Sequence, residues 1–155
     1  MLWLGEQKLM KNFAVKKKEI LEKKVEVSVD HDSDVPQVKF DPGMLRQALL
    51  NLYLNAIDAM DEQGILTIST RFVRRGEGDW VLIEIEDNGS GIDEEDLPHL
   101  FNPFFTRKQY GTGLGLAQVK KIIDLHRGTI EIASEKGRGT KVSVALPAGQ
   151  GNGER

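Results

Sequence analysis

The sequence contains no cysteine and no apolar run that approaches the roughly 20 residues of a bilayer-spanning helix. The lack of cysteine excludes disulfides, thiolate metal sites and a cysteine nucleophile. The chain has no large excess of positive charge, with 21 basic against 24 acidic side chains, and this disfavours nucleic acid as the main partner. The first residues lack the basic end and apolar stretch of a signal peptide, so we expect a cytoplasmic segment without direct membrane contact.

What is present is typical of one soluble domain. The chain has 155 residues, of which 39% are hydrophobic and 29% charged, enough to bury a single core. Glycine is over-represented, with 16 residues against a usual share of about 7%, and many of these glycines fall in three clusters. We expect one domain over residues 1–148 and a disordered tail over 149–155.

The hydrophobic patterns predict helices and strands in mixed order. Helices are predicted over residues 6–24, 41–60, 93–100 and 114–126. Strands are predicted over 25–29, 38–40, 65–73, 80–86, 129–134 and 140–146, and the last four form two antiparallel hairpins. The predicted fold class is therefore α+β, a two-layer sandwich with a mixed, mostly antiparallel sheet and helices on one face.

A narrow polar stripe runs along the otherwise apolar helix predicted over 41–60. Gln47, Asn51, Asn55 and Asp58 follow one another at helical spacing and share one face. The stripe has two interpretations. The stripe forms a hydrogen-bonded core network or solvent-facing seam, or an amide oxygen on it binds Mg²⁺, which prefers oxygen ligands.

Two glycine clusters permit chemistry beyond simple turns. The segment Asp87-Asn88-Gly89-Ser90-Gly91 ends a strand; such a segment is most often a turn, but its Asp can accept a hydrogen bond from the exocyclic amine of a base. The segment 111–116 opens a helix, where backbone N–H groups bind anions. Its spacing does not match the dinucleotide-binding fingerprint, and the chain contains no P-loop.

Five segments in this order resemble the ATP-binding catalytic domain of bacterial sensor histidine kinases. They are similar to that family's N box, first glycine box, F box, second glycine box and third glycine motif. The segments are 51–56, 87–91, 101–105, 111–116 and 137–140. The resemblance implies the fold shared with gyrase and the mismatch-repair ATPases, binding of ATP and Mg²⁺, and transfer of the γ-phosphoryl group to a histidine. It also implies two partners, the dimerisation domain of the parent kinase and a response regulator.

The resemblance further implies roles for individual residues. Asp87 would accept from the adenine amine, with Gly89, Gly91 and Thr140 nearby. Asn55 would hold Mg²⁺ with support from Asn51, and Arg107 and Lys108 would reach the terminal phosphate. The phosphates would meet the backbone of Thr112, Gly113, Leu114, Gly115 and Leu116. A lid over residues 96–111 would be anchored by Phe104 and Phe105.

Departures from the family pattern bear on activity. Asp58 stands where many sensor kinases have a phosphate-binding Lys or Arg. His31, His99 and His126 do not fit the phosphoacceptor pattern, so we expect a catalytic module whose acceptor lies elsewhere.

Two alternatives are a gyrase-type ATPase and an anti-sigma-factor-type serine kinase. Asn51 argues against the first, because those ATPases have a water-activating Glu there, and the aromatic segment 101–105 argues against the second.

Overall fold

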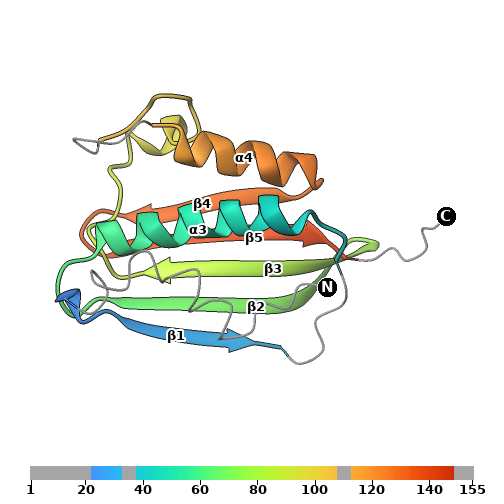
Figure 1. Cartoon of the computed structure of the whole chain (residues 1–155), viewed down its shortest axis with the longest axis horizontal. Helices are drawn as coiled ribbons and strands as arrows, with labels where there is room; N and C mark the ends of the chain where they lie inside the picture. Colours follow the sequence, from blue (N-terminus) through green and yellow to red (C-terminus); the bar gives the residue numbers. More distant parts are fainter. Residues whose placement is uncertain (1–21, 33–37, 108–112, 149–155) are drawn as a thin grey trace.

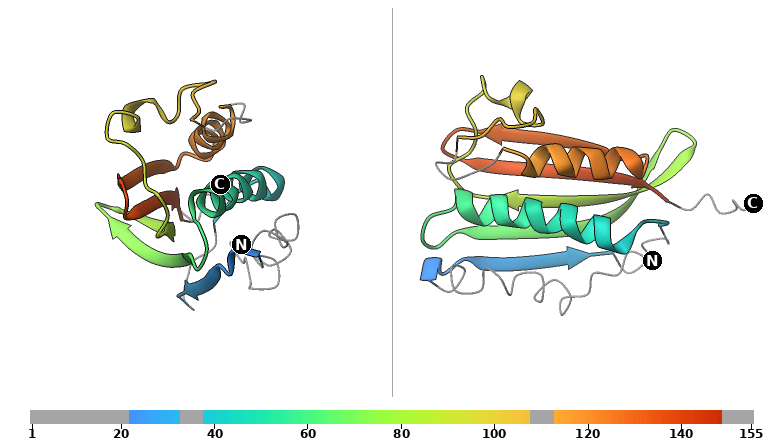
Figure 2. Two further views of the ribbon diagram at one scale, coloured as in Figure 1. Left: turned by 90° about the vertical axis from the view of Figure 1, so that its left-hand side faces the viewer. Right: turned by 45° about the horizontal axis from the view of Figure 1, so that its top comes forward.

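A computed structural model describes residues 22–32, 38–107 and 113–148 of the chain. Its core is a five-stranded sheet covered on one face by two helices (Figures 1 and 2). The strands are β1 (Glu26–His31), β2 (Ile65–Arg75), β3 (Gly78–Asp87), β4 (Thr129–Glu135) and β5 (Gly139–Pro147). The helices are α3 (Pro42–Ala59) and α4 (Gly115–Leu125), and a 3₁₀ turn, η2, covers Leu97–His99. This arrangement confirms the predicted two-layer α+β sandwich.

The sheet has the strand order β1-β2-β3-β5-β4 and mixed direction. The pairs β2–β3, β3–β5 and β4–β5 are antiparallel, which confirms both predicted hairpins. The first two strands run parallel, with Val27 opposite Leu66, and α3 connects them. A parallel pair needs such a crossover because a short turn cannot bring the chain back to the same end of the sheet.

Helix α3 begins as the sequence predicts. The side chain of Asp41 accepts a hydrogen bond from the backbone N–H of Met44 at 3.0 Å, and Pro42 occupies the first turn, where its missing N–H costs nothing. The helix buries one apolar face in the core. That face consists of Leu45, Ala48, Leu49, Leu52, Tyr53, Ala56 and Ile57.

Helix α4 lies beside α3 and is joined to it through His126. The Nε2 atom of His126 accepts from the N–H of Asp41 at 2.9 Å, and Nδ1 lies 2.8 Å from the carbonyl oxygen of Ile122. These partners assign the neutral tautomer with its proton on Nδ1, because Nε2 must accept. The end of α4 is therefore fixed to the N-terminus of α3.

Two predicted elements are wrong. Residues 38–40 form no strand, although Val38 is buried at 3% exposure, because the N-cap of α3 follows at Asp41 before the segment joins the sheet. Of the helix predicted over 93–100 only η2 forms. An α-helix across that range would require an N–H from Pro98 to the carbonyl of Glu94, and proline has none.

Some predictions fall outside the described residues. Most of the helix predicted over 6–24, and the tail over 149–155, are among them. In the part of the chain that the structure does describe, none of the helices has the length and apolar character needed to span a membrane.

Candidate nucleotide-binding site

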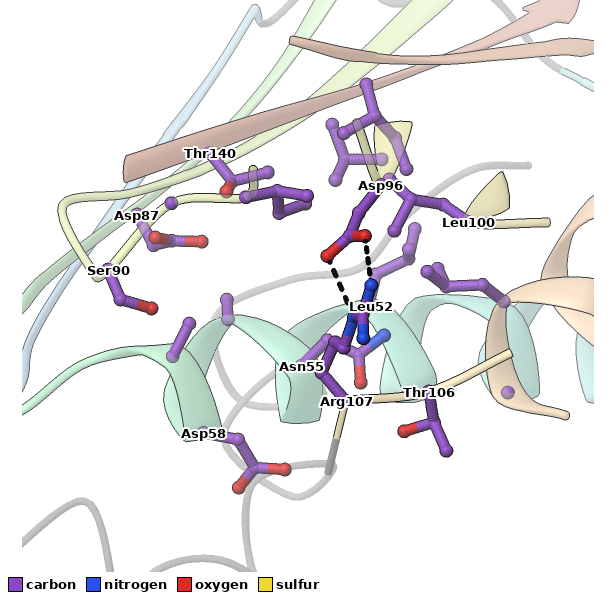
Figure 3. A pocket seen from close by; sticks show the side chains of 18 of the residues that line it. Leu52, Asn55, Asp58, Asp87, Ser90, Asp96, Leu100, Thr106, Arg107 and Thr140 are labelled. Atoms are coloured by element: carbon purple, nitrogen blue, oxygen red, sulfur yellow. Dashed lines mark hydrogen bonds and ion pairs between the residues drawn. The ribbon is translucent and has the colours of Figure 1, made fainter. Parts of the chain in front are cut away.

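A cavity of about 660 Å³ lies between α3, the end of β3, the 92–107 segment, the start of α4 and the β4–β5 hairpin (Figure 3). Its size falls within the roughly 300–1,000 Å³ of small-molecule sites. It brings together nine residues that the sequence singles out: Asn55, Asp87, Gly91, Phe105, Arg107, Gly113, Gly115, Leu116 and Thr140. Asn51, Gly89, Phe104 and Leu114 do not line it, and Lys108 and Thr112 lie outside the described residues.

The apolar walls of the cavity come from residues that the motifs do not include. Ile85 and Val142 belong to neighbouring strands and are partners in the sheet register. Leu52 of α3 and Ile132 of β4 add to the same lining. Strand alternation could have identified Ile85 and Val142 as facing the helices, but not as facing a cavity. Such apolar walls suit a flat aromatic ring.

Asp87 is one of two buried carboxylates that line the cavity, with 7% of its surface exposed; the other is Asp96. Asp87 is the last residue of β3, and its Oδ1 accepts a hydrogen bond from the N–H of Gly89 at 2.9 Å. Burial raises the pKa of Asp87, an effect that backbone hydrogen bonds from Gly89 and Thr140 oppose and the nearby charge of Glu86 reinforces. A carboxylate fixed in this way can accept from a donor on a ligand.

The loop after Asp87 is fixed by contacts to two other elements. The N–H of Ser90 donates to the carbonyl of Ala59 at 2.9 Å, and the carbonyl of Ser90 accepts from Gly137 at 2.7 Å. The N–H of Ile92 donates to Ser134 Oγ at 2.8 Å. The motifs do not include Ser134, which also lies 2.8 Å from Thr140 Oγ1. The loop is thereby held between α3 and the β4–β5 hairpin.

We expect Gly91→Ala to lower the free energy of unfolding by at least about 2 kcal/mol, because an added Cβ introduces both strain and a clash. Gly91 has φ +73°, and its Cβ would lie 2.2 Å from the carbonyl oxygen of Glu135. Gly76→Ala is the matched control, since Gly76 has φ +59° and nothing within 4 Å of the added atom. Urea unfolding of both variants separates strain from clash, and equal losses would contradict the clash.

Phe104, which the resemblance predicts to anchor the lid, is 74% exposed. Its backbone makes the connection instead, because the N–H of Phe104 donates to the carbonyl of Gly113 at 2.9 Å. Gly113 has φ +75°, and a Cβ there would lie 2.3 Å from the carbonyl carbon of Phe104. Phe105 does line the cavity, with its ring centroid 5.8 Å from that of His99.

Only part of the polar stripe on α3 lines the cavity. Asn55 and Asp58 line it, whereas Gln47 is exposed elsewhere on the helix. The Nδ2 atom of Asn51 is buried and has no hydrogen-bond partner among the described residues. Asn55 therefore offers a neutral amide in the cavity, and Asn51 lies one turn before it.

The positive end of α4 also meets the cavity, because Gly113, Gly115 and Leu116 line it. The helix begins at Gly115, and the N-cap residue Leu114 makes no side-chain capping hydrogen bond. The first backbone N–H groups of a helix carry partial positive charge and bind anions. A polyphosphate can therefore lie against this end of the cavity.

Two ion pairs stand at the cavity's edge. Arg107 pairs with Asp96, and this contact holds the pKa of Asp96 below its usual value. Lys136 of the β4–β5 turn pairs with Asp93 at 3.2 Å. All four side chains belong to the lining, so the cavity offers cations as well as the carboxylate of Asp87.

Residues 40–150 match the family described as histidine kinase-, DNA gyrase B- and HSP90-like ATPases, and because this match covers most of the chain, the chain belongs to that family. Its relatives include sensor histidine kinases. Sensor histidine kinase ZraS of Escherichia coli strain K12 is 39% identical over 125 residues, which are 81% of this chain and 26% of ZraS.

Solved structures agree with the sequence comparison. The catalytic domain of histidine kinase ThkA superposes with a TM-score of 0.75 at 29% identity, covering 89% of this chain and 88% of that one. Full-length ShkA in complex with AMPPNP gives a TM-score of 0.75 at 26% identity, covering 93% of this chain and 30% of ShkA. The chain is thus an ATP-binding kinase catalytic domain of the sensor histidine kinase type, and it spans about a quarter of the length of ZraS.

Proposed function

We infer that this domain binds Mg·ATP and transfers the γ-phosphoryl group to a histidine on a separate dimerisation domain, from which a response regulator receives it. The observation that supports this most directly is the buried Asp87 in a cavity that also holds the N-terminus of α4 and an amide of α3. These groups match the three parts of ATP, an amine-bearing base, a polyphosphate and its metal. Phosphoryl transfer needs chiefly positioning and charge neutralisation.

The base would lie at the Asp87 end of the cavity. The carboxylate would accept from the adenine amino group, and the apolar side chains of Ile85 and Val142 would contact the ring. Thr140 stands opposite Asp87 in the sheet register, and Gly91 lines the same cavity. This end of the cavity would therefore discriminate adenine from a base without an amine.

The phosphates would lie toward α4 and the lid. Mg²⁺ would be held by the side-chain oxygen of Asn55 and by the phosphates, and it would neutralise charge that develops during transfer. The described residues contain no group of three or more His, Cys, Asp or Glu that could hold a metal. One protein oxygen is compatible with Mg²⁺, which keeps several waters in nucleotide sites. Arg107 and Lys108 would supply positive charge in place of a basic residue at Asp58.

The acceptor histidine would lie outside residues 1–155. Both ring nitrogens of His126 have hydrogen-bond partners in the fold, so this side chain is engaged structurally. His31 and His99 have the wrong neighbours for the acceptor pattern of the family. The chain alone should therefore not phosphorylate itself.

Two other activities would use the same cavity. A gyrase-type ATPase would need a base to activate water, and Asn51, one turn before Asn55, is an amide that cannot take a proton. An anti-sigma-factor-type serine kinase would phosphorylate a hydroxyl on another protein. The similarity to ZraS and ThkA favours the histidine kinase over both.

We expect the chain alone to bind Mg·ATP, to hydrolyse it very slowly and to acquire no label from [γ-³²P]ATP. Addition of the parent's dimerisation hairpin in trans should give label on the hairpin's histidine, because transfer requires only that the acceptor reach the γ-phosphate in line. The hairpin with that histidine replaced by glutamine is the control.

Acid treatment separates the alternatives, because phosphohistidine is acid-labile and phosphoserine is not. Acid-stable label on the chain or on a separate protein would support the serine kinase. Rapid release of phosphate without any acceptor would support the hydrolase.

A further inference from the structure

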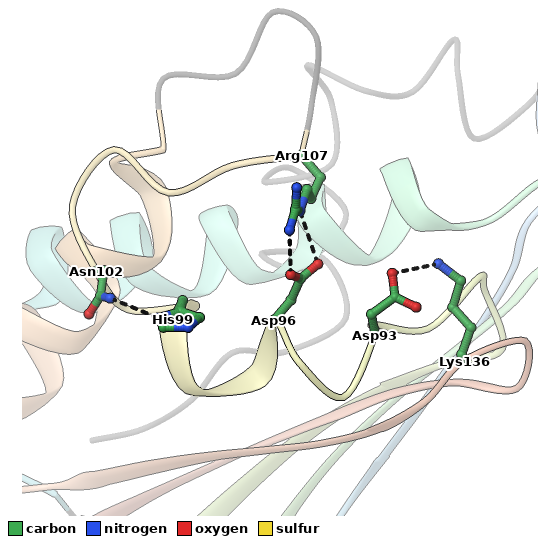
Figure 4. Close-up of polar contacts among 6 residues, drawn as sticks. All are labelled: Asp93, Asp96, His99, Asn102, Arg107 and Lys136. Carbon is green, nitrogen blue, oxygen red and sulfur yellow. Dashed lines mark hydrogen bonds and ion pairs between the residues drawn. The ribbon is translucent and has the colours of Figure 1, made fainter.

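Asp96 and Arg107 form a two-point ion pair at the edge of the cavity (Figure 4). The Nε of Arg107 donates to Oδ2 of Asp96 at 3.1 Å, and Nη2 donates to Oδ1 at 2.7 Å. Two parallel hydrogen bonds of this kind fix the plane of the guanidinium as well as its distance from the carboxylate. The sequence motifs do not include Asp96.

The two partners differ in how firmly they are held. The side chain of Asp96 is 7% exposed, and that of Arg107 is 71% exposed. The backbone of Asp96 is fixed in the turn. Its N–H donates to the backbone carbonyl of Asp93, and its own carbonyl accepts from the backbone N–H of His99, each at 2.9 Å. Asp96 is therefore the fixed partner, and it determines where the exposed guanidinium lies.

A second contact restricts the guanidinium from another side. The central carbon of the Arg107 guanidinium lies 5.5 Å from the ring centroid of Phe105, within the range of a cation–π contact. Phe105 also lines the cavity. The aromatic ring and the carboxylate together hold Arg107 at the edge of the cavity.

The pair leaves donors for a ligand. A guanidinium carries five N–H groups, and the side-on contact with Asp96 uses one on Nε and one on Nη2. The two N–H groups of Nη1 take no part in that contact and can donate to a phosphate oxygen. Arg107 can thus keep its carboxylate partner while it binds an anion, whereas an unpaired carboxylate here would repel one.

We propose that Asp96 is a positioning residue that orients Arg107 toward the terminal phosphate and so gives the site its preference for a nucleoside triphosphate over a diphosphate. This proposal rests on the proposed function, because it assigns Arg107 to the γ-phosphate. The opposite arrangement, in which Asp96 withholds Arg107 from the nucleotide, makes a prediction of opposite sign.

The test is calorimetric titration with Mg·ADP and with Mg·AMPPNP, a triphosphate analogue, for four proteins: wild type, Asp96→Asn, Arg107→Gln and the double variant. Asp96→Asn should weaken AMPPNP binding about 10-fold and change ADP binding less than about 2-fold, because only the third phosphate loses its oriented partner. The double variant should bind AMPPNP no more weakly than Arg107→Gln alone, since both changes remove one interaction.

Asp79→Asn is the matched control. It removes the same charge from another Asp–Arg pair, in which Arg74 Nε lies 3.0 Å from Asp79 Oδ1 on the β2–β3 hairpin and outside the cavity lining. It should leave the affinities for both nucleotides unchanged. Melting temperatures of all variants, measured without nucleotide, separate loss of folding from loss of binding.

Each remaining outcome decides the question. Tighter binding of AMPPNP by Asp96→Asn would show that Asp96 withholds Arg107, and equal weakening of both nucleotides would show that it only shapes the cavity; either result overturns the proposal. An unchanged AMPPNP affinity also overturns it. A wild-type protein that binds neither nucleotide contradicts the proposed function itself.

Discussion

Asp87→Asn should weaken nucleotide binding by about 10- to 150-fold, because hydrogen bonds to charged groups contribute about 1.5–3 kcal/mol and an amide can present a donor to the donating adenine amine. The carboxylate is 7% exposed, so water does not replace the lost interaction. Calorimetry with Mg·ADP measures the change without any contribution from the γ-phosphate. An unchanged ADP affinity would refute the adenine role of Asp87.

The same variant should fold at least as well as the wild type. Burial raises the pKa of Asp87, which means that the folded state disfavours the ionised carboxylate. Removal of the charge should therefore stabilise the folded state at pH values above that pKa. The asparagine oxygen can still accept from Gly89. Nucleotide affinity of the wild type should fall as the pH drops through the raised pKa, because protonation removes the acceptor charge. Asp87→Asn should lack this dependence.

Asn55→Ala should remove the dependence of ATP affinity on Mg²⁺. It should also lower the rate of phosphoryl transfer to the parent's dimerisation hairpin by at least about 100-fold, since a bound metal contributes several kcal/mol to charge stabilisation. The affinity for ATP in EDTA should stay close to that of the wild type. The measurement is a titration of ATP with and without Mg²⁺, combined with the labelling assay. An equal gain from Mg²⁺ in the variant would show that the metal assignment is wrong.

Gln47→Ala is the control for this variant. Gln47 lies two turns before Asn55 on the same polar stripe but is exposed and does not line the cavity. Both substitutions replace an amide on α3 by the best helix former, so neither should destabilise the helix through propensity. A difference between them therefore reports on the cavity and not on the helix.

Local sequence signals identified most of the helices and strands, because capping and alternation each depend on only a few neighbouring residues. Asp41 and Pro42 mark the start of α3 through a cap and a missing N–H, and the helix begins there. Alternation marks the β4–β5 hairpin just as locally. The signal failed at Val38, where an apolar residue is buried without joining the sheet. Burial and strand pairing give the same short apolar pattern, and only tertiary contacts separate them.

The candidate site could be predicted in part. The motifs identify Asp87, Asn55 and the glycines Gly91, Gly113 and Gly115, which the fold brings to one cavity. They do not identify Ser134, which hydrogen-bonds the N–H of Ile92 from 42 residues away. A serine in a strand has no local signal for such a role, because its partner is chosen when the hairpin meets the loop.

The sequence by itself determined the positions of α3, α4 and the two hairpins, together with the order of the glycine motifs. Only the tertiary structure decided that β1 runs parallel to β2 and that Asp96 pairs with Arg107. Propensity, capping and alternation act between near neighbours, whereas parallel pairing depends on a crossover through α3. The ion pair depends on the turn at Leu97–His99 and the residues after it, which bring together two side chains 11 residues apart in the chain.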